Sequence, residues 1–86
     1  MSKSIYGREH RILARLLKEA RQRTGLRQSE VAEQLGQPQS FVSKYEAGER
    51  RLDVIELRKL CHVLGLALPA FIAVLEAEIH NNSSSQ

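Results

Sequence analysis

Apolar residues along the chain recur every three or four positions, the spacing that places side chains on one face of a helix. The pattern is clearest at Leu13, Leu16, Leu17 and Ala20, which stand at i, i+3, i+4 and i+7. The later stripes are Val31, Ala32 and Leu35; Val42 and Tyr45; Leu57, Leu60, Cys61 and Leu64; and a fifth within residues 69–80. No stretch shows the sustained alternation of a strand. The pattern predicts an all-α fold of five short helices.

Glycine, proline and one acidic pair mark where these helices begin and end. The first four helices are expected to end at Gly25, Gly36, Gly48 and Gly65, and Gly25 is expected to be a C-terminal cap in the left-handed conformation. Pro38 and Pro69 are expected to open the third and fifth helices, because the first turn does not use the N–H that proline lacks. Asp53 followed by Glu56 predicts an N-cap and its capping-box partner.

These boundaries predict a single domain over residues 9–80, with neither an internal repeat nor a second domain. Residues 1–8 are expected to form an N-terminal arm or the start of the first helix. The Asn, Ser and Gln residues of 81–86 predict a disordered polar tail. A chain of 86 residues buries only about 60–65% of its unfolded surface, so its core is thin and a partner chain would add stability.

The second and third helices are joined by a turn of only about three residues around Gly36, so they must cross steeply. Ala32 stands where such a crossing leaves no room for a larger side chain. This arrangement, over residues 28–47, is typical of a helix-turn-helix, which presents its second helix outward. A protruding helix fits the DNA major groove, which is about 12 Å wide.

The expected outward face of the third helix has groups that can bind base edges. Ser40, Ser43, Lys44 and Ala47 stand at i, i+3, i+4 and i+7, and Gln39 lies beside them. A glutamine can bind adenine, a lysine guanine, and a serine either a base or a phosphate. A solvated polar face would look similar, but the tight turn favours base contact by Gln39, Ser40, Ser43 and Lys44.

The distribution of charge supports contact with a polyanion. The chain has 13 Lys and Arg against 10 Asp and Glu, a net charge of +3. Residues 1–51 hold 11 basic and 6 acidic side chains, whereas residues 52–86 hold 2 and 4. One basic face is therefore expected. Arg50 and Arg51, which follow the third helix, are expected to contact DNA phosphates.

Features of enzymes and of membrane or secreted proteins are not found in the sequence. The three histidines have no Cys or carboxylate partner at metal-ligand spacing, and neither a phosphate-binding glycine loop nor a nucleophile elbow is present. We therefore expect no catalysis, no metal and no cofactor. The single cysteine fits a reducing compartment, and no apolar run approaches the roughly 18 residues of a membrane span. A cytoplasmic, nucleoid-associated protein is expected.

Residues 16–68 resemble the lambda-repressor/Cro-type helix-turn-helix family, also called the xenobiotic-response-element family of DNA-binding regulators. The resemblance is carried by LLKEARQRTGLRQSEVAEQLG and SFVSKYEAGERRLDVIELRKLCHVLGL. It implies a compact five-helix lambda-repressor-like domain, with the helix-turn-helix at helices two and three. It also implies base contacts by Gln39, Ser40 and Lys44, a phosphate contact by Gln28, and an ion pair between Arg21 and Glu46.

Three positions depart from the family pattern. Arg27 stands where the family often has a serine N-cap, which removes an acceptor worth about 1 kcal/mol but offers a cation to a phosphate. Gln37 replaces an apolar turn residue. Phe41 stands where a small polar residue is common, and it can either touch a thymine methyl group or cover Pro38 and Tyr45. We favour packing, because side chains at i and i+4 are neighbours on a helix.

The fifth helix is expected to have two apolar faces. Phe71, Ile72, Leu75 and Ile79 form the face expected to dock on the core. The other face consists of Ala70, Ala73, Val74 and Ala77. A surface helix needs only one apolar face, so the second predicts a homodimer interface, although exposed alanine is also unremarkable.

Taken together, the sequence favours a small transcriptional regulator that binds double-stranded DNA sequence-specifically. A repressor that reads a palindromic operator as a homodimer through the major groove is the expected form. An antitoxin-like partner or adaptor that binds another protein is the first alternative, and a detached accessory domain of an enzyme is the second.

Overall fold

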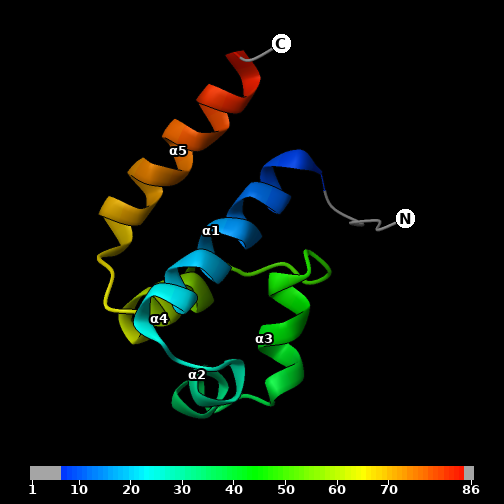
Figure 1. Ribbon diagram of the computed structural model, residues 1–86, viewed down its shortest axis with the longest axis vertical. Helices are drawn as coiled ribbons and strands as arrows, with labels where there is room; N and C mark the ends of the chain where they lie inside the picture. The colour runs from blue at the N-terminus through cyan, green and yellow to red at the C-terminus, as the bar shows by residue number, and fades with distance from the viewer. Residues whose placement is uncertain (1–6, 85–86) are drawn as a thin grey trace.

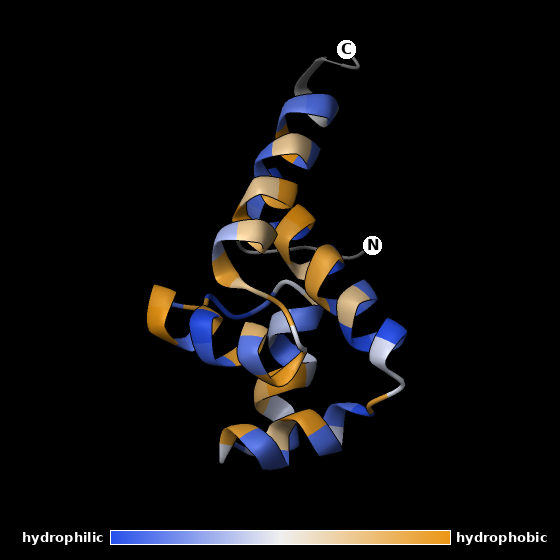
Figure 2. Ribbon diagram, turned by 90° about the vertical axis from the view of Figure 1, so that its left-hand side faces the viewer, coloured by the Kyte–Doolittle hydropathy of each residue, from blue (hydrophilic) through white to orange (hydrophobic). Residues whose placement is uncertain are grey.

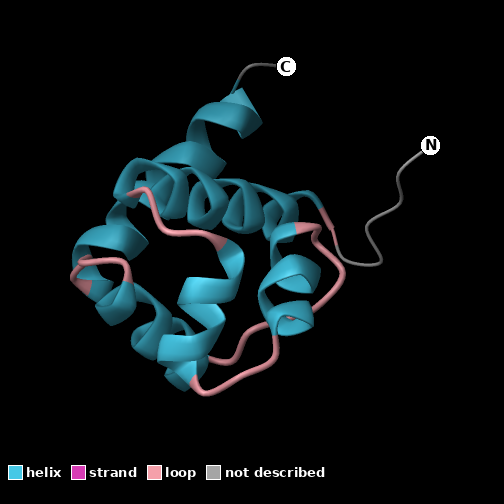
Figure 3. Ribbon diagram, turned by 60° about the horizontal axis from the view of Figure 1, so that its bottom comes forward, coloured by secondary structure: helices cyan, strands magenta, loops and turns pink. Residues whose placement is uncertain are grey.

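The computed structural model describes residues 7–84, with side chains as far as Asn81, and these residues form helices joined by short loops (Figures 1 and 3). The helices are α1 (Arg8–Thr24), α2 (Gln28–Leu35), α3 (Gln39–Glu46), α4 (Val54–Val63) and α5 (Leu68–Ser84). The described residues contain no strand. The prediction of an all-α fold with five helices is confirmed.

The helix ends follow the signals in the sequence. Gly36 has a φ of 69°, and its conformation lets the Gln37 N–H donate to the Ala32 carbonyl at 2.9 Å, which closes α2. At the start of α4, Asp53 Oδ1 accepts from the Glu56 N–H at 2.7 Å while Glu56 Oε1 accepts from the Asp53 N–H at 2.9 Å. The predicted capping box is therefore confirmed. Pro38 is the N-cap of α3 and not a member of its first turn.

The core lies where α1, α2, α3 and α4 meet. Its fully buried side chains come from every one of these helices: Leu17, Val31, Val42, Tyr45, Leu60 and Cys61. α2 packs against both α3 and α4, and α1 packs against α3 and α5. Apolar and polar residues alternate along the helices (Figure 2), and the apolar residues that remain exposed include Val54 and Ile55 of α4 and Val74 of α5. The steep α2–α3 crossing therefore rests on a core common to the whole domain.

α5 packs with one face on this core and extends beyond it (Figure 1). Phe71 is buried, and the other three residues of the predicted docking face, Ile72, Leu75 and Ile79, are partly buried against the core, as expected. An ion pair of 2.8 Å between Arg15 and Glu78 also joins α1 to α5.

The predicted ends of the chain need one correction. α5 runs to Ser84, so the prediction of a disordered tail from residue 81 is wrong for residues 81–84. Asn and Ser are weak helix formers, but neither glycine nor proline interrupts the helix there, so its hydrogen-bonded turns continue. The helix start predicted within 1–8 lies at Arg8, while residues 1–6 and 85–86 lie outside the described residues.

Within residues 7–84, no single helix has both the length and the apolar composition needed to cross a membrane. Val54–Val63 and Leu68–Asn81 reach that length and composition only as a pair, across a bend of 107°.

Candidate nucleic-acid interface

α3 is fixed by one face and leaves the other open to solvent. Val42 and Tyr45 are buried, and Ala32 of α2, 2% exposed, allows the close crossing beneath them. The residues predicted to contact bases lie on the opposite side: Gln39, Ser40 and Lys44 are exposed, and Ser43 is half-buried. Ser43 Oγ is 3.3 Å from the Ser40 carbonyl oxygen, so its hydroxyl also bonds within the helix. The structure therefore brings these four side chains together on one accessible surface.

Phe41 belongs to the packed side of α3. It is 7% exposed and makes an edge-to-face contact with Tyr45, with ring centroids 5.6 Å apart. The expectation of packing is confirmed, and burial takes this ring away from the surface that a thymine methyl group would approach.

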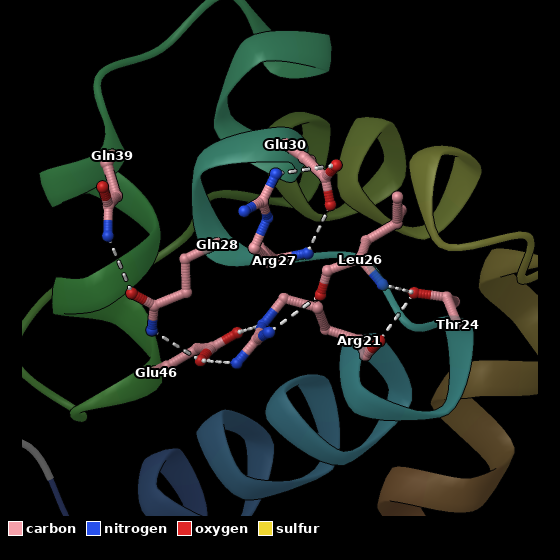
Figure 4. Close-up of polar contacts among 8 residues, drawn as sticks. All are labelled: Arg21, Thr24, Leu26, Arg27, Gln28, Glu30, Gln39 and Glu46. Atoms are coloured by element: carbon pink, nitrogen blue, oxygen red, sulfur yellow. Dashed lines mark hydrogen bonds and ion pairs between the residues drawn. The ribbon is translucent and has the colours of Figure 1, made fainter.

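An ion pair holds the end of α3 against α1 (Figure 4). Arg21 Nε lies 2.7 Å from Glu46 Oε2, and Arg21 Nη2 lies 3.0 Å from Glu46 Oε1. Arg21 Nη1 also donates to the Leu26 carbonyl at 2.9 Å, which fixes the connection between α1 and α2. The two side chains are only 12% and 3% exposed. The ion pair implied by the family resemblance is present, and the carboxylate raises the pKa of Arg21.

Gln28 connects this ion pair to the first residue of α3 (Figure 4). Its Nε2 donates to Glu46 Oε1 at 2.9 Å, so its Oε1 faces Gln39 and accepts from Gln39 Nε2 at 3.4 Å. The amide of Gln39 is thereby oriented through a chain of contacts that includes Arg21 of α1, Gln28 of α2 and Glu46 of α3. The family resemblance implies a phosphate contact for Gln28, and the sequence does not reveal this bridge. No spacing rule reveals such a contact, because the two residues that Gln28 joins lie at opposite ends of α3.

Arg27 begins α2 without a side-chain acceptor, as its chemistry requires. The missing side-chain capping hydrogen bond is partly replaced by a second one, in which Glu30 Oε1 accepts from the Arg27 N–H at 2.8 Å. This backbone hydrogen bond, followed by the nearby guanidinium group, lowers the pKa of Glu30. The Arg27 side chain itself is 79% exposed, so it can reach an anion near the start of α2.

Arg50 is engaged within the protein. Its Nη1 and Nη2 lie 3.2 and 3.1 Å from the two oxygens of Glu56, and its guanidinium carbon stands 4.4 Å from the centroid of the Phe41 ring. Nη1 also donates to the Arg51 carbonyl. These contacts tie the loop after α3 to α4. The hydrogen bonds from Arg50 also lower the pKa of Glu56. Arg50 therefore orders the loop, while the side chain of Arg51 is exposed at the same place.

The exposed face of α3 carries groups that can form hydrogen bonds. Within the described part of the chain, no three His, Cys, Asp or Glu residues are close enough to hold a metal ion. This face of α3 offers amide and hydroxyl groups that donate and accept, with one ammonium group.

Two comparisons decide the family. Residues 17–71 match the model of a family described as helix-turn-helix. A solved structure of an XRE-family-like protein from Pseudomonas syringae pv. tomato str. DC3000 is 48% identical in sequence, over 81% of this chain and 85% of that one, with a TM-score of 0.76. This chain belongs to the XRE family of helix-turn-helix proteins.

More distant structures share the fold of this XRE-family chain. A variant of a restriction–modification controller protein is 21% identical, over 87% of this chain and 95% of that one, with a TM-score of 0.79. The clp gene regulator ClgR from C. glutamicum is 21% identical, over 87% and 96%, with a TM-score of 0.74. No curated protein sequence matches the chain. Family membership supports DNA-binding transcriptional regulation.

Proposed function

We propose that the chain binds double-stranded DNA sequence-specifically as a homodimer, with α3 in the major groove, and represses transcription by occupying a palindromic operator. The observation that carries the proposal is the orientation of Gln39 by Gln28 on an otherwise open polar helix face. A side chain held in place before binding loses less conformational freedom on contact.

Base recognition is assigned to the exposed face of α3. Gln39 can bind adenine through its amide, Lys44 can donate to guanine, and Ser40 can donate or accept. Ser43, half-buried, is placed at the edge of the same contact. The N–H groups at the start of α3 would face the same groove and favour a nearby phosphate.

Phosphate contacts are assigned to both sides of that helix. Arg27 lies at the start of α2, and Arg51 lies in the loop after α3. Gln28 can serve as well, because a primary amide has two N–H donors and the bond to Glu46 uses one of them. Arg50 can contribute positive potential, but its donors are directed at Glu56 and at the backbone.

The dimer is assigned to α5. Ala70, Ala73, Val74 and Ala77 are all exposed in the single chain, and Val74 keeps 49% of its accessible surface. Small side chains allow two helices to approach closely, and a two-fold pair would carry its α3 helices to half-sites about 34 Å apart. Such a protein would act on the DNA of the cytoplasm.

Selection of bound sequences from random double-stranded DNA, with the unaltered full chain, tests the proposal directly. The expected product is an inverted repeat whose half-site centres are about one helical turn apart. An enriched single half-site without symmetry would remove the palindrome and the dimer but keep sequence reading. No enrichment over the input, despite salt-dependent binding, would remove sequence-specific recognition altogether.

A further inference from the structure

One hollow in the described surface lies away from the residues assigned to DNA. It has a volume of about 720 Å³ and is formed by the end of α2, the outer face of α4 and the connection into α5. We call it the α2–α4 groove. It is lined by Gln34, Leu35, Arg58, Lys59, His62, Val63, Leu66, Leu68 and Pro69. None of these residues belongs to the proposed base, phosphate or dimer contacts.

The floor of the α2–α4 groove is apolar and incompletely covered. Leu35, Val63, Leu66 and Leu68 pack against the core, yet each is only partly buried. Ile55 does not line the groove, but it stands one helical turn before Arg58 and Lys59 on α4 and is 57% exposed. The groove therefore combines partly exposed leucine side chains with polar groups along its lining.

The charge of the α2–α4 groove is one-sided. Arg58 and Lys59 are exposed, and they are the only Lys or Arg residues between positions 52 and 86. The lining includes no carboxylate. Ile55, Arg58, Lys59 and His62 stand at i, i+3, i+4 and i+7, so one face of α4 presents an apolar residue followed by two cations and an imidazole. Within an otherwise acidic segment, this groove is a local positive site.

We propose that the α2–α4 groove is a docking site for an acidic amphipathic helix of a partner protein. Apolar side chains of that helix would rest on Leu35, Leu66 and Leu68, and its carboxylates would pair with Arg58 and Lys59. The groove is lined by residues from the end of α2, from α4 and from the start of α5, and its two cations favour an acidic ligand. Because α3 is not part of the groove, the partner can bind while the DNA surface is occupied.

The test uses the full chain, labelled with nitrogen-15, and a blocked synthetic peptide of about a dozen residues. The peptide carries leucines at i, i+3, i+4 and i+7 and glutamates elsewhere, so that it becomes an acidic amphipathic helix when it folds in the groove. Binding is followed in NMR spectra of the protein as the peptide is added. The backbone amide resonances of the residues that line the groove should shift, and raising the salt concentration should weaken the binding. Lys59→Glu should weaken it about tenfold. Lys18→Glu, the same change on α1, is the matched control and should leave it unaltered.

Each other outcome overturns the proposal. Equal binding by Lys59→Glu, or equal binding of a peptide with glutamine for glutamate, would show that charge does not select the ligand. Signals that move on α3 would place the peptide at the DNA surface, and no binding at millimolar peptide would exclude the site. If a second copy of the chain fills the groove, Lys59→Glu will lower the sedimenting mass and peptide binding will fall as protein concentration rises. DNA binding by Lys59→Glu is measured separately and should be unchanged, so this proposal can fail without the proposed function.

Discussion

The side-chain amide of Gln28 donates a hydrogen bond of 2.9 Å to the carboxylate of Glu46 and so joins the start of α2 to the end of α3. The same carboxylate is held by Arg21, and the oxygen of the same amide accepts from Gln39. The bond therefore decides which way the Gln28 amide faces, and through it how Gln39 is presented. A link that fixes the packing of three helices thus also prepares the surface assigned to DNA.

Replacement of Gln39 by alanine is expected to weaken binding to the preferred site by about 1–3 kcal/mol and to relax selection at one base pair. The reason is that its amide is the only group at the start of α3 held by Gln28, among the residues described. Fluorescence anisotropy with the selected operator and its single-base variants measures both effects. Gln22→Ala removes an exposed amide on α1 and serves as the control. Equal losses on operator and random DNA would show that Gln39 does not read a base.

Arg21→Met is expected to destabilise the fold by about 3–5 kcal/mol, because it leaves the Glu46 carboxylate, 3% exposed, without its cation. Urea unfolding followed by circular dichroism measures the change. The double change Arg21→Met with Glu46→Leu should recover much of the loss, since no buried charge remains. Arg15→Met is the comparison. Because the Arg15 side chain is 46% exposed, the loss of its ion pairs should lower the free energy of unfolding by less than about 1 kcal/mol. Similar losses for Arg15 and Arg21 would mean that burial does not decide the strength of the pair.

The sequence was sufficient for the features that local chemistry controls. The glycine after α2, the Asp53 capping box and the apolar stripes depend on a few neighbouring residues, and all three were predicted. The full length of α5 was not predicted, because the polar composition of residues 81–86 indicates disorder, whereas the helix continues to Ser84. Propensity is a weak signal at the end of a helix that is already formed.

The contacts that organise the candidate site depend on how helices cross, and the sequence showed only part of them. The Arg21–Glu46 pair was expected from the family resemblance alone. The bridge by Gln28 and the contacts of Arg50 join residues whose proximity no helical period specifies. The sequence therefore predicts the same role for Arg50 and Arg51, although the structure gives them different surroundings.

That difference makes a prediction for the two adjacent arginines. Arg50→Ala should lower the free energy of unfolding by about 1 kcal/mol or more, because it removes a paired hydrogen bond to Glu56 and the contact with Phe41. Arg51→Ala should reduce the slope of log binding constant against log salt by about 1. Urea unfolding and salt-dependent anisotropy of both variants separate the two roles. A lowered salt slope for Arg50→Ala with no loss of stability would reverse the assignment.

The stability of the domain is expected to fall in acid partly through Glu56. Hydrogen bonds from Arg50, followed by the backbone N–H of Asp53, lower the pKa of Glu56 below its ordinary 4.5. The unfolded chain therefore binds this proton at a higher pH than the folded chain does. The stabilisation is complete above the unfolded pKa and is lost as the pH falls through the folded pKa. Urea unfolding from about pH 6 down to about pH 3 should show a shallower decline for Glu56→Gln than for the unaltered chain. Parallel declines would show that this carboxyl group does not contribute.

A glutamate at position 73 is expected to separate the proposed dimer. Ala73 lies at the centre of the exposed apolar face of α5, where a carboxylate would have to be buried, without a partner, against a second copy. Ala73→Glu should sediment as a monomer and should bind a two-half-site operator more weakly, while its affinity for an isolated half-site should stay the same. Gln22→Glu places the same carboxylate on the exposed side of α1 and should change neither quantity. Because Ala73 is exposed in the single chain, the substitution can be made without disturbing the core, and unfolding should confirm it. A folded Ala73→Glu protein of unchanged sedimenting mass would place any dimer contact elsewhere on the molecule.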